Sequence, residues 1–276
     1  MPFSILILTC NEEVNLPACL KSMQRCDDIV ILDSFSIDDT EKIANTFGIK
    51  FHRRAFDNYA AQRNHGINQI TFKHPWLLMV DADEIVPPEL FTEIENVVSS
   101  KDDSTTLYRM RRKDHFMGRW IKRSSGYPTW FGRLIKIGSV RVERAINEEY
   151  ATDGKIGYLE HHLNHYPFNK GLSAWLEKHN RYSTMEAQLI VNGELAPSSL
   201  KNLINKDPTI RRKTVKAVVY RIPGRPLLVF IAFYILRGGF LDGKAGLTFC
   251  ALRAFYEFMI DCKVRESRLR SRSLPL

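Results

Sequence analysis

The chain has 276 residues, of which 44% are hydrophobic and 26% charged, a balance typical of a globular protein rather than a disordered or fully membrane-embedded one. Its length suits one α/β core with an appendage and argues against two large independent domains. The five cysteines include no C-x-x-C pair, which argues against a disulfide framework or a zinc knuckle and fits a reducing cytosol.

The formal charge of +9 is unevenly distributed along the chain. Residues 201–276 contain 16 Lys and Arg against 5 Asp and Glu, an excess of +11, so the first 200 residues carry 24 against 26, or −2. We therefore expect a main α/β domain over residues 1–200 and a basic tail over residues 201–276 that meets an anionic partner.

Four apolar runs alternate with polar or amphipathic stretches over the first 110 residues, and this rhythm predicts βαβ units around a mostly parallel sheet. The N-terminal run lacks a basic region and a cleavage site, so we interpret it as a core strand and expect no export. The expected strands are Phe3–Leu8, Ile29–Leu32, Ile49–Arg53 and Trp76–Val80. The expected helices between them are Val14–Cys26 and Asp38–Phe47.

The second half of the chain has a different pattern. Residues 105–165 are rich in Arg, Gly and aromatic residues, with short strand-like pieces that we expect to fold over the carboxyl-end edge of the sheet. Helices are expected at Leu172–Val191 and Leu200–Val219, followed by two apolar stretches at Leu227–Leu236 and Ala245–Ile260.

The strongest chemical signal is the motif Asp81-Ala82-Asp83-Glu84, directly after the apolar run Trp76–Val80. Ligands of open α/β sheets collect beyond the carboxyl ends of the strands, so these carboxylates should face the ligand. Two such oxygens can hold Mg²⁺ or Mn²⁺, which would bridge the diphosphate of a nucleotide sugar. An isolated D-x-D is more often a solvated loop, and the neighbouring strand ends decide between the two interpretations.

Those strand ends carry three further motifs: Thr9-Cys-Asn-Glu-Glu13, Asp33-Ser-Phe-Ser-Ile-Asp-Asp-Thr40, and Phe56-Asp-Asn-Tyr-Ala-Ala-Gln-Arg-Asn-His-Gly66. Together with the acidic motif they cover residues 9–84 in the order found in one family. The chain resembles the family 2 glycosyltransferases of the GT-A fold, most closely the lipopolysaccharide core glucosyltransferases of the WaaE/KdtX type.

The resemblance implies a role for each matched residue around a UDP-type donor. Glu12 and Asp33 would hold the uracil and ribose, while Thr9 and Asn11 would shape the first loop.

In the later motifs, Arg63 and Asn64 would face the ribose or diphosphate. Asp81 would orient the sugar or ribose, and Asp83 would contact the metal. Gly66 would allow close backbone approach.

A family 2 enzyme is expected to invert the anomeric centre by one displacement, which needs a base for the acceptor hydroxyl. In the resembled group a G-x-x-x-R-L segment precedes V-H-E; here Gly132-Arg-Leu-Ile135 precedes Ala145-Ile-Asn-Glu-Glu149, with Asn in place of His. Glu148 is the first candidate base, Glu149 the second and Glu84 the third. As a structural alternative, Glu148 could pair with an arginine.

Two other groups belong to this region. Arg133 would neutralise the donor phosphates, because the arginine fork matches phosphate oxygens. His161, His162 and His165 lack the spacing of a zincin, so we expect them to line or brace the acceptor side and to bind no zinc.

Neither apolar stretch of the tail reaches the roughly 20 residues that spanning requires. Basic residues flank both stretches, which suits an interfacial helix on an anionic leaflet better than a nucleic-acid surface. We therefore expect a peripheral protein on the cytoplasmic face of the inner membrane, near a glycan or lipid-linked acceptor. A helical hairpin packed on the catalytic domain, or a dimer interface, is the structural alternative.

Three other functions stay open at this point. A polyprenyl-phosphate sugar transferase would act on an ionised acceptor and would not need Glu148. A nucleotidyltransferase should show an early Gly-rich basic loop, and this chain has Asn-Glu-Glu there instead. A membrane-binding module without catalytic activity would leave the strand-end motifs without a purpose.

Overall fold

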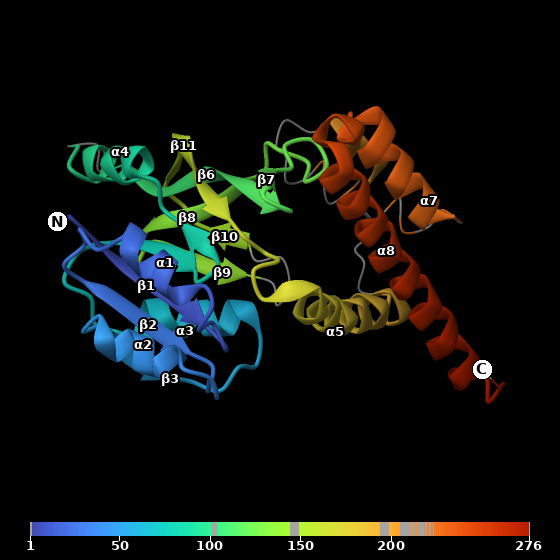
Figure 1. Cartoon of the computed structure of the whole chain (residues 1–276), viewed down its shortest axis with the longest axis horizontal. Coiled ribbons are helices and arrows are strands. Elements are labelled where there is room, and N and C mark those ends of the chain that lie inside the picture. Colours follow the sequence, from blue (N-terminus) through green and yellow to red (C-terminus); the bar gives the residue numbers. More distant parts are fainter. Residues whose placement is uncertain are drawn as a thin grey trace. The chain divides into compact units, whose positions relative to one another are not determined.

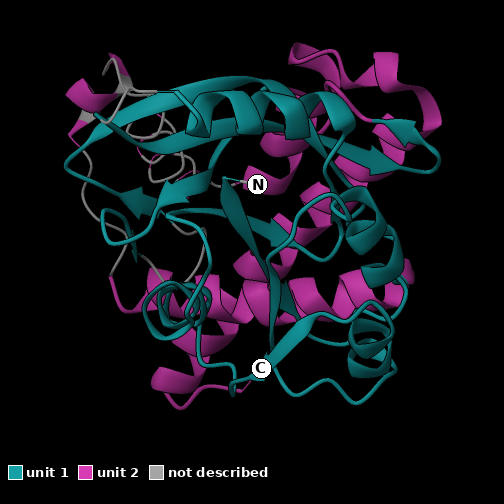
Figure 2. Cartoon of the chain, turned by 90° about the vertical axis from the view of Figure 1, so that its left-hand side faces the viewer, with its two compact units in different colours: residues 1–120, 127–170 teal, residues 121–126, 171–276 magenta. Residues whose placement is uncertain are grey.

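The computed structural model describes residues 2–100, 104–143, 149–193, 199–204 and 224–275, with residues 211, 214, 218, 220 and 222. These residues form two compact units (Figure 2). Unit 1 comprises Met1–Trp120 and Tyr127–Lys170, and unit 2 comprises Ile121–Gly126 and Gly171–Leu276. The sequence suggested a boundary at residue 200, whereas these units divide after Lys170.

Unit 1 is built on a nine-stranded mixed sheet with the strand order β3-β2-β1-β4-β8-β6-β11-β5, and β7 pairs with β6 (Figure 1). The pairs among β3, β2, β1 and β4 are parallel, β8 is antiparallel to both its neighbours, and β11 is parallel to β6. The strands are β1 Phe3–Thr9, β2 Ile29–Asp33, β3 Lys50–Arg53, β4 Trp76–Asp81, β5 Glu84–Ile85, β6 Thr105–Phe116, β7 Arg119–Trp120, β8 Trp130–Lys136 and β11 Lys155–His165. A separate antiparallel pair joins β9 Arg141–Glu143 and β10 Glu149–Ala151.

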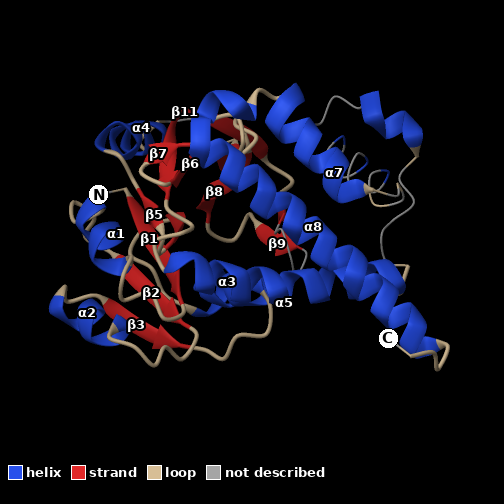
Figure 3. Cartoon of the chain, turned by 45° about the vertical axis from the view of Figure 1, so that its right-hand side comes forward, coloured by secondary structure: helices blue, strands red, loops and turns tan. Residues whose placement is uncertain are grey.

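Helices cover both faces of this sheet (Figure 3). They are α1 Leu16–Ser22, α2 Thr40–Thr46, α3 Tyr59–Gln69 and α4 Pro88–Val98. Leu20 of α1 and Phe91 of α4 belong to the core on one face, and Ile67 of α3 belongs to the core on the other. β1, β2 and β4 lie between these layers and are buried along almost their whole length, which explains why they are continuous apolar runs.

The predicted fold class, a mostly parallel sheet flanked by helices, is confirmed, as are the four predicted N-terminal strands. The prediction for residues 105–165 was wrong in one respect. Instead of only folding over the strand ends, β8, β6 and β11 continue the sheet beyond β4. The 12-residue strand β6 was hard to identify from the sequence, because its second half contains four consecutive charged residues, Arg111–Asp114, and is only partly buried.

Unit 2 is helical. Its elements are α5 Gly171–Val191, η1 Leu200–Ile204, α7 Arg225–Phe230, the π-helical η2 Ile231–Leu236, η3 Gly239–Asp242 and α8 Gly243–Ser271. Both α5 and α7 pack on α8, around the buried residues Ala187, Ile260 and Val264. The helix expected at Leu200–Val219 begins as the short 3₁₀ turn η1, and residues 205–210 with most of the rest lie outside the described residues.

The turn between η2 and α8 is hydrogen-bonded to the segment of residues 121–126. The Asp242 carboxylate accepts hydrogen bonds from the backbone N–H groups of Arg123 and Ser124, at 2.9 and 2.7 Å, and from the Ser124 hydroxyl at 2.7 Å. A Cβ on Gly246 would lie 2.2 Å from the Gly239 carbonyl oxygen, so only glycine fits there. Close packing therefore explains why glycine occupies this turn.

No single described helix is long and apolar enough to cross a membrane. The segments Arg225–Leu236 and Gly239–Ser271, bent by 71° with respect to each other, meet that length and composition only as a pair.

Candidate active site

The loops after β1 and β2 form one hydrogen-bonded frame. In the parallel register Thr9 lies beside Asp33, and its hydroxyl donates to the buried Asp33 carboxylate at 2.7 Å. The same carboxylate accepts from the Ser36 backbone N–H at 2.7 Å and from its hydroxyl at 2.5 Å. Asn11, in the left-handed region at φ 54°, accepts at its side-chain oxygen from the Ile37 N–H at 2.8 Å. Asp33 thus organises both loops from within.

Lys170 closes this frame from the last residue of unit 1. Its ammonium donates to the carbonyl oxygens of Cys10 and Asn11 at 3.2 and 3.0 Å and to the Glu12 carboxylate at 2.8 Å. Asn15 donates to the other Glu12 oxygen at 2.8 Å. Burial raises the pKa of Glu12, although Asn15 and Lys170 oppose that effect. No sequence pattern marks Lys170, because it lies 160 residues away from Cys10 in the loop that it holds.

Asp81 lies at the end of β4 between two buried arginines. Its carboxylate is 2.7 Å from the Arg63 guanidinium of α3 and 2.6 Å from the Arg133 guanidinium of β8. Burial alone would raise the pKa of Asp81, but Arg133 and Arg63 hold it well below its usual value. Arg63 and Arg133 therefore both form ion pairs with this carboxylate, and the Asp81 side chain is 31% exposed.

Glu84 is fully buried behind Asp81. One of its oxygens lies 2.8 Å from Arg133 and 3.5 Å from Arg112, and the other accepts from the Asp81 backbone N–H at 3.0 Å. A carboxylate held in this way has no route to an acceptor hydroxyl. We conclude that Glu84, the third candidate base, fixes the acidic turn and does not act as a base.

Asp83 occupies a different environment from its two acidic neighbours. Its carboxylate lies 3.3 Å from Nε2 of His165, whose Nδ1 lies 2.6 Å from Asp114. Burial and Arg112 lower the pKa of His165, yet Asp83 and Asp114 outweigh them and raise it. The space between these carboxylates therefore favours positive charge.

This environment fits a divalent cation at Asp83. Carboxylate oxygen and imidazole nitrogen are both ligands of Mn²⁺, and Mg²⁺ commonly uses one or two carboxylates with the remaining ligands from substrate phosphates and water. Among the described residues, no group of three or more His, Cys, Asp and Glu side chains is arranged to hold a metal. Asp83 would thus hold an ion whose other ligands come from the substrate, and His165 could join it only as the neutral imidazole, because a metal-binding histidine must lose its proton.

Asn64 is held by the backbone of β9. Its side-chain amide donates to the Val142 carbonyl at 2.7 Å and accepts from the Val142 N–H at 2.9 Å. Gly66, two residues on, is required by packing, since a Cβ there would lie 2.5 Å from a Leu6 methyl carbon. Asn64 therefore ties α3 to the small β9–β10 sheet.

The two remaining candidate bases lie around the start of β10. Glu148 lies outside the described residues. Glu149 is the first residue of β10 and pairs with Glu143 of β9 in an antiparallel register. Both stay predictions for the base.

The three histidines of the H-H-x-x-H segment lie in three environments. His161 contacts Glu93 of α4 at 2.9 Å, and His165 lies beside Asp83. His162 points to the opposite face of the sheet, where its ring is stacked on Trp120 with 6.5 Å between the centroids. The three rings therefore have different neighbours in this structure, whereas the ligands of a single zinc ion would have to converge on one point.

His162 belongs to an aromatic and basic set that sequence reasoning missed. Successive β6 side chains alternate between faces, so Arg111 and Lys113 lie opposite Arg112 and Asp114. Arg111 lies over the Trp130 ring at 5.1 Å, and Lys113 lies over the Trp120 ring at 4.8 Å. Only the cross-strand register brings these residues together, and no motif marks them in the sequence.

The sheet and its strand-end loops have the arrangement of α/β enzymes, in which ligands bind at the carboxyl ends of parallel strands. Residues 4–157 match the model of Glycosyl transferase family 2. The chain belongs to this family, as the sequence motifs predicted. The protein is therefore a transferase.

Named relatives cover nearly the whole chain. The chain is similar to the lipopolysaccharide core biosynthesis glycosyltransferase LpsC of Rhizobium meliloti, with 24% identity over 273 residues, 96% of this chain and 92% of that protein. It is also similar to an uncharacterized glycosyltransferase of Rickettsia typhi, with 25% identity over 98% of this chain and 89% of that protein. A solved structure, glucosyl-3-phosphoglycerate synthase from Mycobacterium tuberculosis in complex with Mg²⁺ and UDP, aligns with a TM-score of 0.34 and 18% identity, covering 40% of this chain and 43% of that chain.

Proposed function

We propose that this protein transfers a sugar from a nucleotide-sugar donor, UDP-glucose in the first instance, to a lipopolysaccharide core or other cell-envelope glycan, with inversion at the anomeric carbon. Family membership supports glycosyl transfer. The name of the LpsC relative supports a lipopolysaccharide core acceptor. The strand-end loops of unit 1 supply the donor site.

The observation that carries this proposal is the contrast between Asp81 and Asp83. Both follow β4, but Asp81 lies between two buried arginines, whereas Asp83 lies beside His165. A solvated acidic loop would not need this buried support. We assign Mg²⁺ or Mn²⁺ to Asp83, and the ion when bound would supply positive charge to the leaving diphosphate.

The protein's own residues prepare the donor site. Thr9, Asp33 and Lys170 hold the first two loops in one shape before the donor binds, which lowers the entropic cost of binding. Glu12 would present its carboxylate to the uracil and ribose from this frame. Arg63 and Arg133 act through Asp81, which keeps enough exposure to contact the sugar or ribose.

Inversion in a single displacement requires a base opposite the leaving group to take the proton of the acceptor hydroxyl. Glu148 is the first candidate and Glu149 the second. A polyprenyl-phosphate acceptor is already ionised, so the need for either glutamate separates the two kinds of acceptor.

We further propose that the protein is peripheral on the cytoplasmic face of the inner membrane. Unit 2 supports this location with a set of exposed apolar side chains that we call the apolar set: Leu227, Leu228, Ile235, Leu236, Phe240, Leu241, Leu247, Phe255 and Phe258. The +11 excess of residues 201–276 adds attraction to anionic lipids.

The proposal is tested by screening UDP-sugars for UDP release with Mg²⁺, with Mn²⁺ and with EDTA, in the presence of lipopolysaccharide core acceptors and of polyprenyl phosphate. We expect cation-dependent release from one UDP-sugar, stimulated by the core acceptor. Stimulation by polyprenyl phosphate alone would replace the acceptor in this proposal. Undiminished turnover in excess EDTA would contradict the role of the metal.

A further inference from the structure

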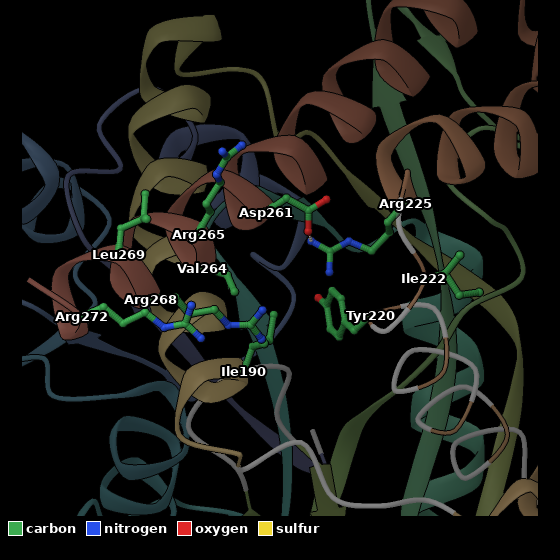
Figure 4. Close-up of a pocket in the computed structure, with 10 residues that line it drawn as sticks. All are labelled: Ile190, Tyr220, Ile222, Arg225, Asp261, Val264, Arg265, Arg268, Leu269 and Arg272. Carbon is green, nitrogen blue, oxygen red and sulfur yellow. Dashed lines mark ion pairs between the residues drawn. The ribbon is translucent and has the colours of Figure 1, made fainter. Parts of the chain in front are cut away.

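Unit 2 contains a pocket of about 550 Å³, within the range of small-molecule sites in proteins. One side is formed by α8, and the opposite side by Tyr220, Ile222 and Arg225 (Figure 4). The described residues that line it are Ile190, Tyr220, Ile222, Arg225, Asp261, Val264, Arg265, Arg268, Leu269 and Arg272.

One arginine of the pocket is neutralised by the protein. Arg225 is 1% exposed, lies 3.0 Å from the Glu257 carboxylate and 2.8 Å from Asp261, and stacks over the Tyr220 ring at 4.3 Å. Its charge is satisfied inside the fold. Asp261, the acidic residue that lines the pocket, is therefore already in use.

The other three arginines are arranged differently. Arg265, Arg268 and Arg272 are exposed and line the same pocket. Arg265 and Arg268 lie three residues apart on one face of α8, and Arg272 is the residue that caps its C-terminus. Within the described part of the chain, no carboxylate lies within ion-pair distance of any of them. Like charges one turn apart on a helix destabilise it, so this face has an excess of positive charge that an anion would relieve.

Apolar side chains lie beside these arginines. Val264 belongs to the buried cluster of unit 2 and Ile190 packs against it, while Leu269 lies next to Arg268 on α8. Ile222, 40% exposed, lines the opposite side. A free inorganic anion would leave this apolar lining in water, whereas an acyl chain would cover it.

We propose that this pocket binds a single amphiphile that carries a phosphate group, with the phosphate at Arg265, Arg268 and Arg272 and the chain against the apolar lining. Three guanidinium groups suit the several oxygens of a phosphate. The inference goes beyond the proposed function, because it assigns a saturable site in unit 2 that is independent of sugar transfer. It also differs from general attraction to an anionic surface, which needs no pocket.

Isothermal titration calorimetry of the full chain tests this site with three probes: dihexanoyl phosphatidic acid below its micellar concentration, inorganic phosphate and dihexanoyl phosphatidylcholine. We expect phosphatidic acid to bind once per chain and about ten-fold or more tighter than either other probe. Equal affinity for inorganic phosphate would overturn the amphiphile, and equal affinity for phosphatidylcholine would overturn the phosphate. The absence of saturable binding would overturn the site.

Matched variants separate the pocket from overall charge. Arg268→Ala should weaken phosphatidic acid binding about ten-fold, while Arg270→Ala, on the same helix and paired with Glu266, should change it less than about two-fold. Leu269→Ser should weaken it as well, and Leu247→Ser, exposed on α8 outside the pocket, should not. Equal losses within either pair would contradict a defined pocket. Both pairs involve residues that are not fully buried, and helical circular dichroism verifies their folding.

Discussion

Arginine serves opposite purposes in the two units. In unit 1, Arg63 and Arg133 are buried and each contacts an acidic residue of the β4 turn. In unit 2, three exposed arginines at the C-terminal end of α8, Arg265, Arg268 and Arg272, have no carboxylate partner among the described residues. The first group fixes the shape of a site and the second presents charge to a partner, so substitutions should affect the first through the fold and the second through binding.

The largest effect is expected at Asp83. Asp83→Asn should lower transfer on the order of 10³-fold, because the neutral amide is a poor ligand for a hard cation at the leaving diphosphate. Thermal stability should change less than for a change at Asp81, since Asp83 lies 3.3 Å from His165 with 17% exposure and does not sit between two buried arginines. Initial rates of UDP release at saturating Mn²⁺ measure the loss.

Asp81→Asn is compared with Asp83→Asn to separate a structural role from a role in transfer. Asp153→Asn, in an exposed loop, is the control for the loss of one carboxylate. Removing the Asp81 charge leaves Arg63 and Arg133 buried without it, so we expect a loss of about 3 kcal/mol in the free energy of unfolding. If Asp81→Asn is as stable as the parent, or Asp83→Asn keeps full activity, the division of roles between the two aspartates is wrong.

The second prediction concerns the base. Glu148→Gln should lower kcat by about two to four powers of ten, the usual contribution of general base catalysis, and should leave donor affinity unchanged. Glu149→Gln serves as the neighbouring comparison, and single-turnover kinetics separate the chemical step from binding. A loss only at Glu149 would shift the assignment by one residue. Wild-type behaviour of both variants would favour a phosphate acceptor.

Sequence reasoning reached furthest where chemistry is local. The four N-terminal strands and their end motifs follow from apolar periodicity and from short polar patterns, because parallel strands carry both signals within a few residues. It failed for partners far apart along the chain. Lys170 reaches Glu12 through loop closure, and Asp114 reaches His165 through the pairing of β6 with β11. Sheet register likewise brings aromatic rings next to Arg111 on the opposite face.

Some site residues were identified from the sequence, but their contacts in the structure differ from the predicted ones. Arg133 was expected to contact phosphates, and in the structure it contacts Asp81 and Glu84. Its conformation could not be foreseen from composition, since an arginine beside an acidic motif can face either the ligand or the carboxylates. The pocket on α8 was hidden for a similar reason, because its lining comes from three separate segments.

The third prediction tests the turn that organises unit 2. Gly246→Ala should lower the free energy of unfolding by about 2 kcal/mol or more, because the added methyl carbon would lie 2.2 Å from a backbone oxygen that cannot move aside easily. Chemical denaturation followed by circular dichroism gives the value. Cys262→Ala, at an exposed position of the same helix, should change it by less than about 0.5 kcal/mol. Equal stability of the two variants would remove the packing reason for this glycine.

A smaller effect is expected at Lys170. Lys170→Met keeps the aliphatic stem and removes the ammonium that holds the Cys10, Asn11 and Glu12 loop. The donor KM should rise about ten-fold, the cost of one charge-assisted contact, with a smaller change in kcat. The matched variant Lys21→Met, on the exposed side of α1, should match the parent. A loss in kcat alone would show that Lys170 acts on the reaction rather than on the loop.

The smallest effect is expected at the membrane, where many weak contacts share the binding free energy. Leu236→Ser removes one exposed member of the apolar set and should weaken co-sedimentation with anionic liposomes about three-fold to ten-fold, whereas Met117→Ser, an exposed apolar residue of unit 1, should not. Raising salt from 0.1 to 1 M shortens the Debye length from about 10 to about 3 Å, so electrostatic attraction falls while apolar insertion persists. Partial release at high salt should therefore be greater for Leu236→Ser than for the parent. Equal binding of both variants would contradict attachment through unit 2. If binding to both neutral and anionic liposomes were unaffected by salt, the basic residues would have no role in attachment.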